Sequence, residues 1–322
     1  MQGKIKTMNE KTKTAEFVSP KHPDKICDRI ADAILDAYLS GDPKSRVAVE
    51  VMAGHGQISV SGEVTSQADA DIEKIARSIA GGNHEVHSYL AKQSAFIAKG
   101  VDSGGAGDQG IMIGYATAET DNFMPLEYEL ARKLCRGIYE KYPFDGKTQV
   151  TVEGDKTRTV VASFQNTKAA ELEELTRELI KADEYLINPA GDWTLGGFDA
   201  DSGLSGRKIV IDNYGPEIGV GGGSFSGKDY TKVDRSGAYM ARRIAVDYLR
   251  NNPAVNISRV KLAYAIGKAE PVMAVVELDG REEKVEGYNL TPDGIYKFLG
   301  LDKVRFSETA EWGHFGRGFS WG

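Results

Sequence analysis

Residues 23–64, PDKICDRIADAILDAYLSGDPKSRVAVEVMAGHGQISVSGEV, predict a helix followed by a β-hairpin. Apolar side chains recur every three or four positions in the first half of this stretch, which is the spacing of one helical face. Pro23 suits the first position of that helix, and Gly41 ends it. Strand-like residues follow at 46–52 and 57–64, and the glycines between them favour a tight turn.

The same order of helix, strand, strand and helix recurs twice further along the chain. The expected helices span 24–40, 67–80, 124–141, 168–181 and 231–250, and the expected strands span 46–52, 57–64, 148–153, 158–164, 208–213, 257–265 and 272–278. This pattern predicts an α+β fold of three similar subdomains, each a sheet with helices on one face. We expect a flexible tail at 1–14 and subdomains at 15–110, 111–194 and 195–322.

The composition indicates a soluble, acidic, globular protein. Its 322 residues are 41% hydrophobic, which is ample for two or three small cores. The net charge of −7 disfavours a general nucleic-acid surface, so a phosphate site must be a cleft with locally concentrated lysines. No apolar run approaches about 18 residues, the first fourteen residues do not resemble a signal peptide, and two cysteines are too few for a disulfide framework. We expect a cytoplasmic protein.

The glycine-rich stretch 221–234, GGGSFSGKDYTKVD, is the most informative motif. Part of it has the Walker A spacing, but Asp229 stands where a P-loop needs Ser or Thr, and no strand-like residues precede it. Its small residues expose backbone N–H groups, and a helix that began near Lys228 would place Lys228 and Lys232 on one face with Asp234 nearby. The alternative is a surface loop that leads into a solvated helix.

Two further motifs combine polar side chains with a turn or a helix start. In SPKHPDK, the side chains of His22, Asp24 and Lys25 lie at the positive end of the expected helix, where they could bind a phosphate and a cation or simply cap the helix. In GGAGDQG, at 104–110, Asp108 lies among glycines that permit close backbone approach to a ligand, although a flexible linker has the same composition.

The remaining motifs are charged turns. The stretch DSGLSGRK, at 201–208, brings Arg207 and Lys208 to a glycine turn that could hold phosphate oxygens or be an ordinary surface turn. The clusters together supply the cations and carboxylates of a Mg²⁺-triphosphate site: Lys25, Lys147, Arg207, Lys208, Lys228 and Lys232 with Asp24, Asp108, Asp145, Asp201 and Asp234. By contrast, His84 and His87 lack further ligands at metal spacing and are expected to be a surface pair.

The order of these motifs resembles the S-adenosylmethionine synthetases. The matching stretches are HPDK at 22–25, VSGEVTS at 60–66, GAGDQG at 105–110, INP at 187–189, GLSGRK at 203–208, GGGSFSGKDYTKVDRS at 221–236, YAIGKAEP at 264–271 and ETAEWGHFGR at 308–317. The resemblance covers nearly all of residues 15–317. It implies three similar α+β subdomains around a pseudo-threefold axis, and a homodimer or dimer of dimers with active sites between subunits.

The resemblance also implies the reaction. The sulfur of methionine attacks C5′ of ATP and expels tripolyphosphate, which is then cleaved to phosphate and pyrophosphate, with two Mg²⁺ ions per site and K⁺ as cofactors. Because sulfur is already a good nucleophile, the protein needs to align the substrates and neutralise the leaving group rather than supply a base.

Each site residue is carried over by its position in a matching motif. Catalytic roles fall to His22, Lys147, Arg207, Lys228 and Lys232. ATP-binding roles fall to the same five residues and to Lys25, Asp108, Trp193, Lys208 and Ile266. Methionine-binding roles fall to Glu63, Lys99, Asp201 and Lys232. The metal ligands would be Asp24 and Asp234 for Mg²⁺ and Glu50 for K⁺.

The chain departs from the family pattern mainly at the methionine end. The stretch before residue 104 is abbreviated where relatives carry a longer active-site loop, and Lys99 stands where they have glutamine. Trp193 replaces a phenylalanine beneath the adenine, and the larger ring should still stack. Two other functions fit the sequence less well: a non-catalytic partner subunit, which the retained phosphate-site lysines disfavour, and a P-loop kinase, which Asp229 disfavours.

Overall fold

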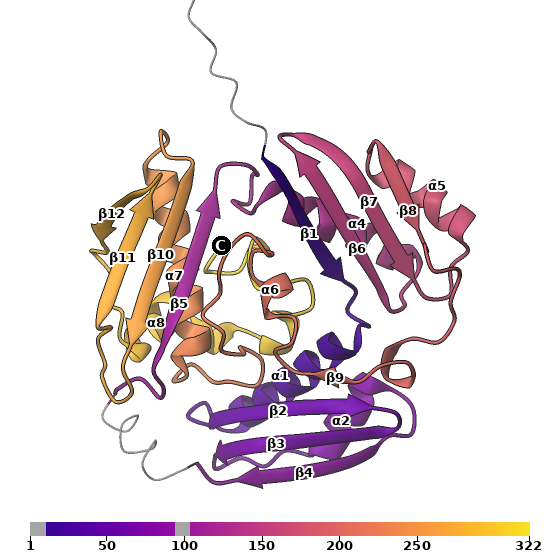
Figure 1. Ribbon diagram of the computed structural model, residues 1–322. Helices are drawn as coiled ribbons and strands as arrows, with labels where there is room; N and C mark the ends of the chain where they lie inside the picture. Colours follow the sequence, from indigo (N-terminus) through magenta and orange to yellow (C-terminus); the bar gives the residue numbers. More distant parts are fainter. Residues whose placement is uncertain (1–10, 94–103) are drawn as a thin grey trace, which may run out of the picture.

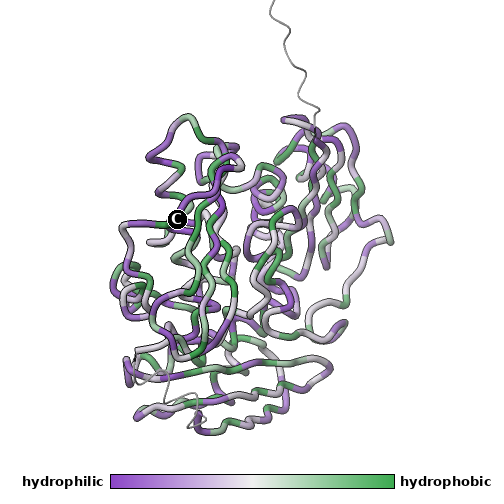
Figure 2. Tube along the Cα trace, turned by 60° about the vertical axis from the view of Figure 1, so that its left-hand side comes forward, coloured by the Kyte–Doolittle hydropathy of each residue, from purple (hydrophilic) through white to green (hydrophobic). Residues whose placement is uncertain are grey.

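The computed structural model describes residues 11–93 and 104–322, and its core is three four-stranded sheets. Figure 1 shows them as the three sides of a triangle around a common centre, which confirms the predicted fold of three similar α+β subdomains. The strand orders are β4-β3-β2-β9, β1-β6-β7-β8 and β12-β11-β10-β5. In Figure 2 hydrophobic residues run along the strands and inner helices, whereas the outer turns are largely hydrophilic.

The elements have the following bounds. The strands are β1 (Thr12–Val18), β2 (Arg46–Gly54), β3 (Gln57–Thr65), β4 (Glu85–Ala91), β5 (Gly110–Thr117), β6 (Gly146–Glu153), β7 (Lys156–Phe164), β8 (Glu184–Ile187), β9 (Gly203–Leu204), β10 (Ile257–Tyr264), β11 (Met273–Leu278) and β12 (Arg281–Lys284). The helices are α1 (Pro23–Gly41), α2 (Ile72–Ala80), α4 (Leu126–Lys141), α5 (Ala169–Leu179), α6 (Ile209–Asp212), α7 (Val233–Asn251) and α8 (Pro292–Leu299), with short 3₁₀ turns at Gly197–Asp199, Leu301–Lys303 and Phe306–Glu308.

One long helix packs on each sheet: α1 on β2, α4 on β1 and β6, and α7 on β5 and β10. The predicted first helix is confirmed, and its start is fixed locally. The His22 ring accepts a hydrogen bond from the Asp24 N–H, and Pro23 occupies the first helical position, where its missing N–H costs nothing. The face of α1 that carries Ile30 and Ile34 is fully buried.

Each sheet takes one strand from a distant part of the chain. Strand β1 pairs with β6, β5 pairs with β10, and β9 pairs with β2, all antiparallel. Sequence divisions at 110 and 194 therefore do not separate the sheets, and the predicted subdomain boundaries stay a prediction. Strand β1 begins at Thr12, so the last three residues of the expected tail belong to a sheet.

The prediction of a strand at 208–213 is wrong, because residues 209–212 form the short helix α6. Three β-branched residues suggested a strand, but the Asp212 N–H bonds to the Lys208 carbonyl at 2.7 Å and the segment lies between sharp turns at Gly206 and Gly215. Helix α2 also begins at Ile72 rather than near 67. Within the described ranges, no helix has the length and apolarity needed to cross a membrane.

Candidate active site

The first group of site residues forms where α1 begins against the turn 203–208. The Asp24 carboxylate accepts the Leu204 N–H at 2.9 Å and binds the Lys208 ammonium at 2.5 Å, with the Arg207 Nε at 3.5 Å. Gly203 permits this approach, since a Cβ there would lie 2.3 Å from the carbonyl oxygen of Pro23. The structure therefore brings His22 and Asp24 together with Arg207 and Lys208, which lie far away in the sequence.

The His22 imidazole is neutral at neutral pH. Burial and the nearby Lys208 together lower the pKa of His22 to about 4, against the opposing effect of Asp24. Its Nδ1 accepts the Asp24 N–H at 3.2 Å, so the proton of the neutral ring must be on Nε2. The ring can therefore donate a hydrogen bond to an anionic oxygen without carrying a charge.

Replacing Lys208 by methionine should raise the pKa of His22, because the substitution removes a nearby positive charge. It also removes the ammonium group that pairs with Asp24, whose negative charge favours the protonated ring. A ¹³C-histidine NMR titration would measure this, with His22→Asn identifying the resonance among the five histidines. We expect a wild-type midpoint near 4 and a higher midpoint in the variant. A wild-type midpoint near the usual histidine value would contradict the neutral-ring assignment.

Three further predicted residues lie around this group. Lys147, on β6, is exposed, and its ammonium lies 3.4 Å from Glu16. Asp201 is exposed, and its charge raises the pKa of His22 while that of Lys147 lowers it, so both side chains are within electrostatic reach of the ring. Trp193 is half-buried beside Gly196, next to the Gly197 N–H that donates to Asp145 at 2.9 Å.

The second group forms where the glycine-rich loop meets α7. The Lys228 ammonium binds the Asp234 carboxylate at 2.8 Å. Gly223 packs directly on that carboxylate, because a Cβ there would lie 2.3 Å from Asp234 Oδ1. The helix expected at 231–250 begins at Val233, so Lys228 and Lys232 precede it and do not share a helical face. Each lysine has its own carboxylate partner.

Glu50 lies between the two groups. Its carboxylate accepts a hydrogen bond from the Ser205 hydroxyl, which belongs to the turn of the first group. Burial raises the pKa of Glu50, and the charges of Lys228 and Asp234 in the second group also act on it, in opposite directions. The two groups are therefore linked electrostatically within one chain.

Asp229 is a functional residue that the sequence reasoning missed. It is fully buried and accepts hydrogen bonds from the Val47 N–H at 2.7 Å, from the Thr231 N–H and hydroxyl, and from the Lys232 ammonium at 2.6 Å. It thus anchors the loop to β2 and fixes Lys232. In the sequence, Asp229 stands out only as a departure from the Walker A motif. The pattern that could have indicated its role is an acid three residues before a lysine, which favours an ion pair.

Replacing Asp229 by asparagine should lower the free energy of unfolding by about 1–3 kcal/mol, because the amide leaves the buried Lys232 ammonium without a counter-charge. Chemical denaturation monitored by circular dichroism would measure the loss. Asp155→Asn, at an exposed hairpin turn, is the control and should be neutral. Equal stability of the two variants would contradict the anchoring role.

The other predicted residues have the following positions. The buried Lys25 ammonium pairs with Asp212 at 2.5 Å, so it lies behind the first group and not at its surface. Glu63 lies on the same face of the sheet as Glu50, diagonally across β2 and β3. The Lys99 prediction lies outside the described residues.

Asp108 and Ile266 lie in adjoining segments. The Ala106 N–H donates to the Lys268 carbonyl at 2.9 Å, and the Gly267 N–H donates to the Ala106 carbonyl at 2.8 Å. The Gly107 N–H donates to the Thr231 carbonyl at 3.1 Å, which joins the same segment to the loop of Lys228 and Lys232. Asp108 and Ile266 are both exposed beside the second group.

The carboxylates fit a cation that also takes ligand oxygens. In residues 11–93 and 104–322, no three His, Cys, Asp or Glu side chains converge to hold a metal ion. Asp24 and Asp234 each offer one carboxylate beside lysines, and Mg²⁺ commonly binds through one or two carboxylates plus phosphate oxygens. His84 packs on Phe198 and His87 contacts Gln57, so the two rings have separate partners.

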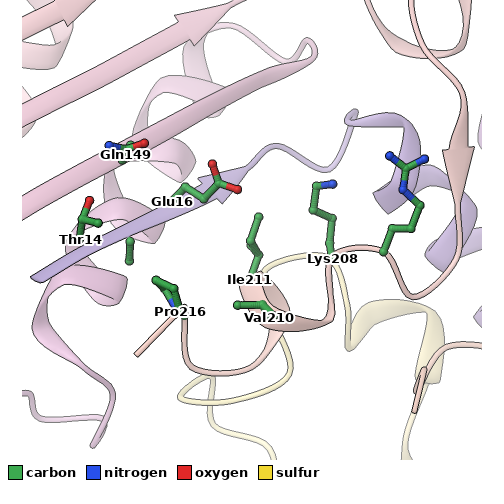
Figure 3. A pocket seen from close by; sticks show the side chains of 10 residues that line it. Thr14, Glu16, Gln149, Lys208, Val210, Ile211 and Pro216 are labelled. Atoms are coloured by element: carbon green, nitrogen blue, oxygen red, sulfur yellow. The ribbon is translucent and has the colours of Figure 1, made fainter. Parts of the chain in front are cut away.

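A cavity of about 330 Å³ adjoins the first group. Figure 3 shows its two sides: Thr14, Glu16 and Gln149 come from strands β1 and β6, and Lys208, Val210, Ile211 and Pro216 come from the segment that contains α6. Arg207 also lines it. The cations of the turn 203–208 therefore lie beside open space and are not packed into the core.

Comparison with known proteins identifies the family. Three family models cover the chain: the N-terminal domain of S-adenosylmethionine synthetase at 10–97, its central domain at 103–193 and its C-terminal domain at 195–322. The S-adenosylmethionine synthase of Nocardia farcinica (strain IFM 10152) is 40% identical, with 97% of this chain and 95% of that protein aligned. The enzyme of the same name from Mycoplasmopsis synoviae (strain 53) is also 40% identical, with 94% of this chain and 92% of that protein aligned.

The alignment with the Nocardia protein spans 386 positions, more than the 322 residues of this chain, so that relative carries segments that this chain lacks. The matches nevertheless extend over nearly the whole length of both proteins. This chain belongs to the S-adenosylmethionine synthetase family.

Proposed function

We propose that this chain synthesises S-adenosylmethionine from ATP and methionine. The observation that carries the proposal is the convergence of His22, Asp24, Arg207 and Lys208 at the start of α1, in a member of this family. In the reaction, the methionine sulfur forms a bond to C5′ of ATP while the C5′–oxygen bond breaks. The bonding electrons leave with the tripolyphosphate, which water then cleaves to phosphate and pyrophosphate.

The proposed work of the protein is alignment and charge neutralisation. The neutral His22 ring donates a hydrogen bond from Nε2 to the leaving oxygen, and it needs no proton transfer to do so. Arg207 and Lys208 from the turn, Lys147 from β6 and Lys228 from the glycine-rich loop supply cations to the phosphates. Lys25 and Lys232 contribute from buried positions, where their ion pairs hold the surrounding backbone.

Asp24 and Asp234 are the proposed Mg²⁺ ligands, two ions per site, and Glu50 is the proposed K⁺ ligand. Bound Mg²⁺ would supply positive charge to the triphosphate oxygens. In the structure, Asp24 pairs with Lys208 and Asp234 pairs with Lys228. When phosphate oxygens attract those ammonium groups, the carboxylates become available to a cation.

The remaining assignments concern the two ends of the substrate pair. Asp108, Trp193 and Ile266 are proposed to hold the adenosine, and Glu63, Asp201, Lys99 and Lys232 to hold methionine. We further propose a cytoplasmic homodimer or dimer of dimers, with active sites between subunits. This arrangement would let exposed side chains such as Lys147 and Ile266 face a partner.

Incubation of the purified chain with ATP, methionine, Mg²⁺ and K⁺, followed by mass analysis, tests the proposal. We expect S-adenosylmethionine together with phosphate and pyrophosphate. Formation of ADP alone would contradict it, because that product requires cleavage at the γ-phosphate without adenosyl transfer. Absence of turnover by the chain alone, with restoration of activity by a relative's subunit, would instead indicate a non-catalytic partner.

A further inference from the structure

Four aspartates follow one stripe of α1 at intervals of four residues, and each accepts backbone N–H groups from another segment. The Asp24 carboxylate accepts Leu204 N–H at 2.9 Å, Asp28 accepts Gly206 N–H at 2.8 Å, Asp32 accepts Gly227 N–H at 2.8 Å, and Asp36 accepts Phe306 and Ser307 N–H at 2.8 and 2.9 Å. Residues four apart lie on one helical face, so α1 holds all these segments in a row.

The first three aspartates hold two segments that carry phosphate-site cations. The turn 203–208, with Arg207 and Lys208, is held at two points, and the loop 224–228, with Lys228, is held at one. The segments touch at Gly206, where a Cβ would lie 2.7 Å from Ser224. Any shift of one segment along α1 would therefore displace the other.

Asp28 is the aspartate that holds the turn 203–208 at Gly206, the point where this turn touches the loop 224–228. Its side chain is buried. Oδ1 accepts the Gly206 N–H, and Oδ2 accepts no hydrogen bond within the described part of the chain. The Lys25 ammonium lies 4.0 Å from Oδ2. Burial raises the pKa of Asp28 to about 6, and Lys25, the Gly206 N–H and the Ser226 hydroxyl of the second segment all act to lower it.

Resting on the proposed function, we propose that Asp28 is a positioning residue for adenosyl transfer. It touches no substrate; it sets the distance of the turn 203–208 from α1 and from the loop 224–228, and thereby the position of the cations Arg207, Lys208 and Lys228. The length of the side chain at this position therefore matters more than its charge. Displacement of a binding group by about 1 Å can lower a rate about a hundredfold.

Two substitutions separate length from charge. Asp28→Asn keeps the length and the oxygen that accepts the Gly206 N–H, whereas Asp28→Glu keeps the charge but adds a methylene. We expect D28E to lower kcat about 10- to 100-fold and to weaken binding of Mg²⁺-tripolyphosphate, measured by calorimetry, about tenfold or more. D28N should stay within about threefold of wild type in both measurements.

Asp36→Glu is the matched control, because Asp36 lies on the same stripe and accepts the same kind of bond from a segment without phosphate-site cations. We expect it to lower Tm with unchanged kcat and tripolyphosphate affinity. Wild-type kcat and tripolyphosphate affinity in D28E would overturn the proposal. Losses of kcat and affinity in D28N or in D36E that equal those in D28E would also overturn it. Failure of the wild-type chain to make S-adenosylmethionine would instead refute the proposed function, and tripolyphosphate binding would still test the positioning role.

Discussion

Replacing Lys228 by alanine should lower turnover by about 10²- to 10³-fold, the usual loss when one preorganised group that stabilises a developing anion is removed. The Lys228 ammonium lies at the end of the glycine-rich loop and is held by Asp234 at 2.8 Å. Tripolyphosphate leaves with the electrons of the broken C5′–oxygen bond, so a cation at this place contributes more to the transition state than to bound ATP. Loss should therefore appear mainly in kcat.

Single-turnover assays with saturating ATP, methionine and Mg²⁺ would measure the effect. Lys228→Arg keeps the charge and should retain more activity than Lys228→Ala. Lys284→Ala removes an exposed lysine on strand β12, far from the site, and should match wild type. The Lys228 side chain is only 17% exposed, so Tm must be measured beside turnover, and near-normal turnover of folded Lys228→Ala would sink the assignment.

The sequence predicted well those parts of the fold that depend on local patterns. The helix 24–40 and the hairpin at 46–52 and 57–64 are present because apolar spacing, Pro23 and the turn glycines all favour the same local structure. The pairings of β1, β5 and β9 with distant strands carry no comparable local signal, and β4 and α8 were also missed.

The short helix α6 shows why a local pattern can fail. Ile209, Val210 and Ile211 favour a strand by propensity, but the segment lies at the centre of the three sheets, where Asp212 binds the Lys25 ammonium and the segment covers a cavity (Figures 1 and 3). Tertiary contacts decide its conformation, and a single sequence does not display them.

For the candidate site, the sequence indicated which cations and acids to expect better than it indicated which residues each of them contacts. The cations and acids of the first group, each in a recognisable turn or helix start, do lie together in the structure, and their roles stay predictions. The sequence could not tell that Lys25 and Lys232 are buried in ion pairs while Lys147 is exposed, since all three look alike as lysines beside acids or glycines. Asp28 and Ser205 went unnoticed because their importance depends on the segments they contact.

The largest expected loss of stability follows from the buried pair of Asp32 and Arg235. The guanidinium binds both carboxylate oxygens, at 2.6 and 2.8 Å, and it also donates to Thr309 and lies over the Phe306 ring at 4.4 Å. Asp32 also accepts the Gly227 N–H, so this pair joins α1, α7, the glycine-rich loop and the C-terminal segment.

Arg235→Met should lower the free energy of unfolding by about 3–5 kcal/mol, because it leaves the Asp32 carboxylate buried without its counter-charge. The double variant Asp32→Leu with Arg235→Met should be more stable than either single variant, since replacing a whole buried pair by apolar groups avoids an unpaired charge. Urea denaturation of the four proteins forms a double-mutant cycle that measures the coupling.

The cycle also separates the two roles of the pair. If its main contribution is to hold the loop 224–228 in place, the double variant should regain stability yet remain slow, because the Gly227 N–H has still lost its acceptor. Recovery of both stability and turnover would instead mean that Phe225 and its buried neighbours fix the loop without Asp32. A loss below about 1 kcal/mol in Arg235→Met would contradict the buried-pair argument itself.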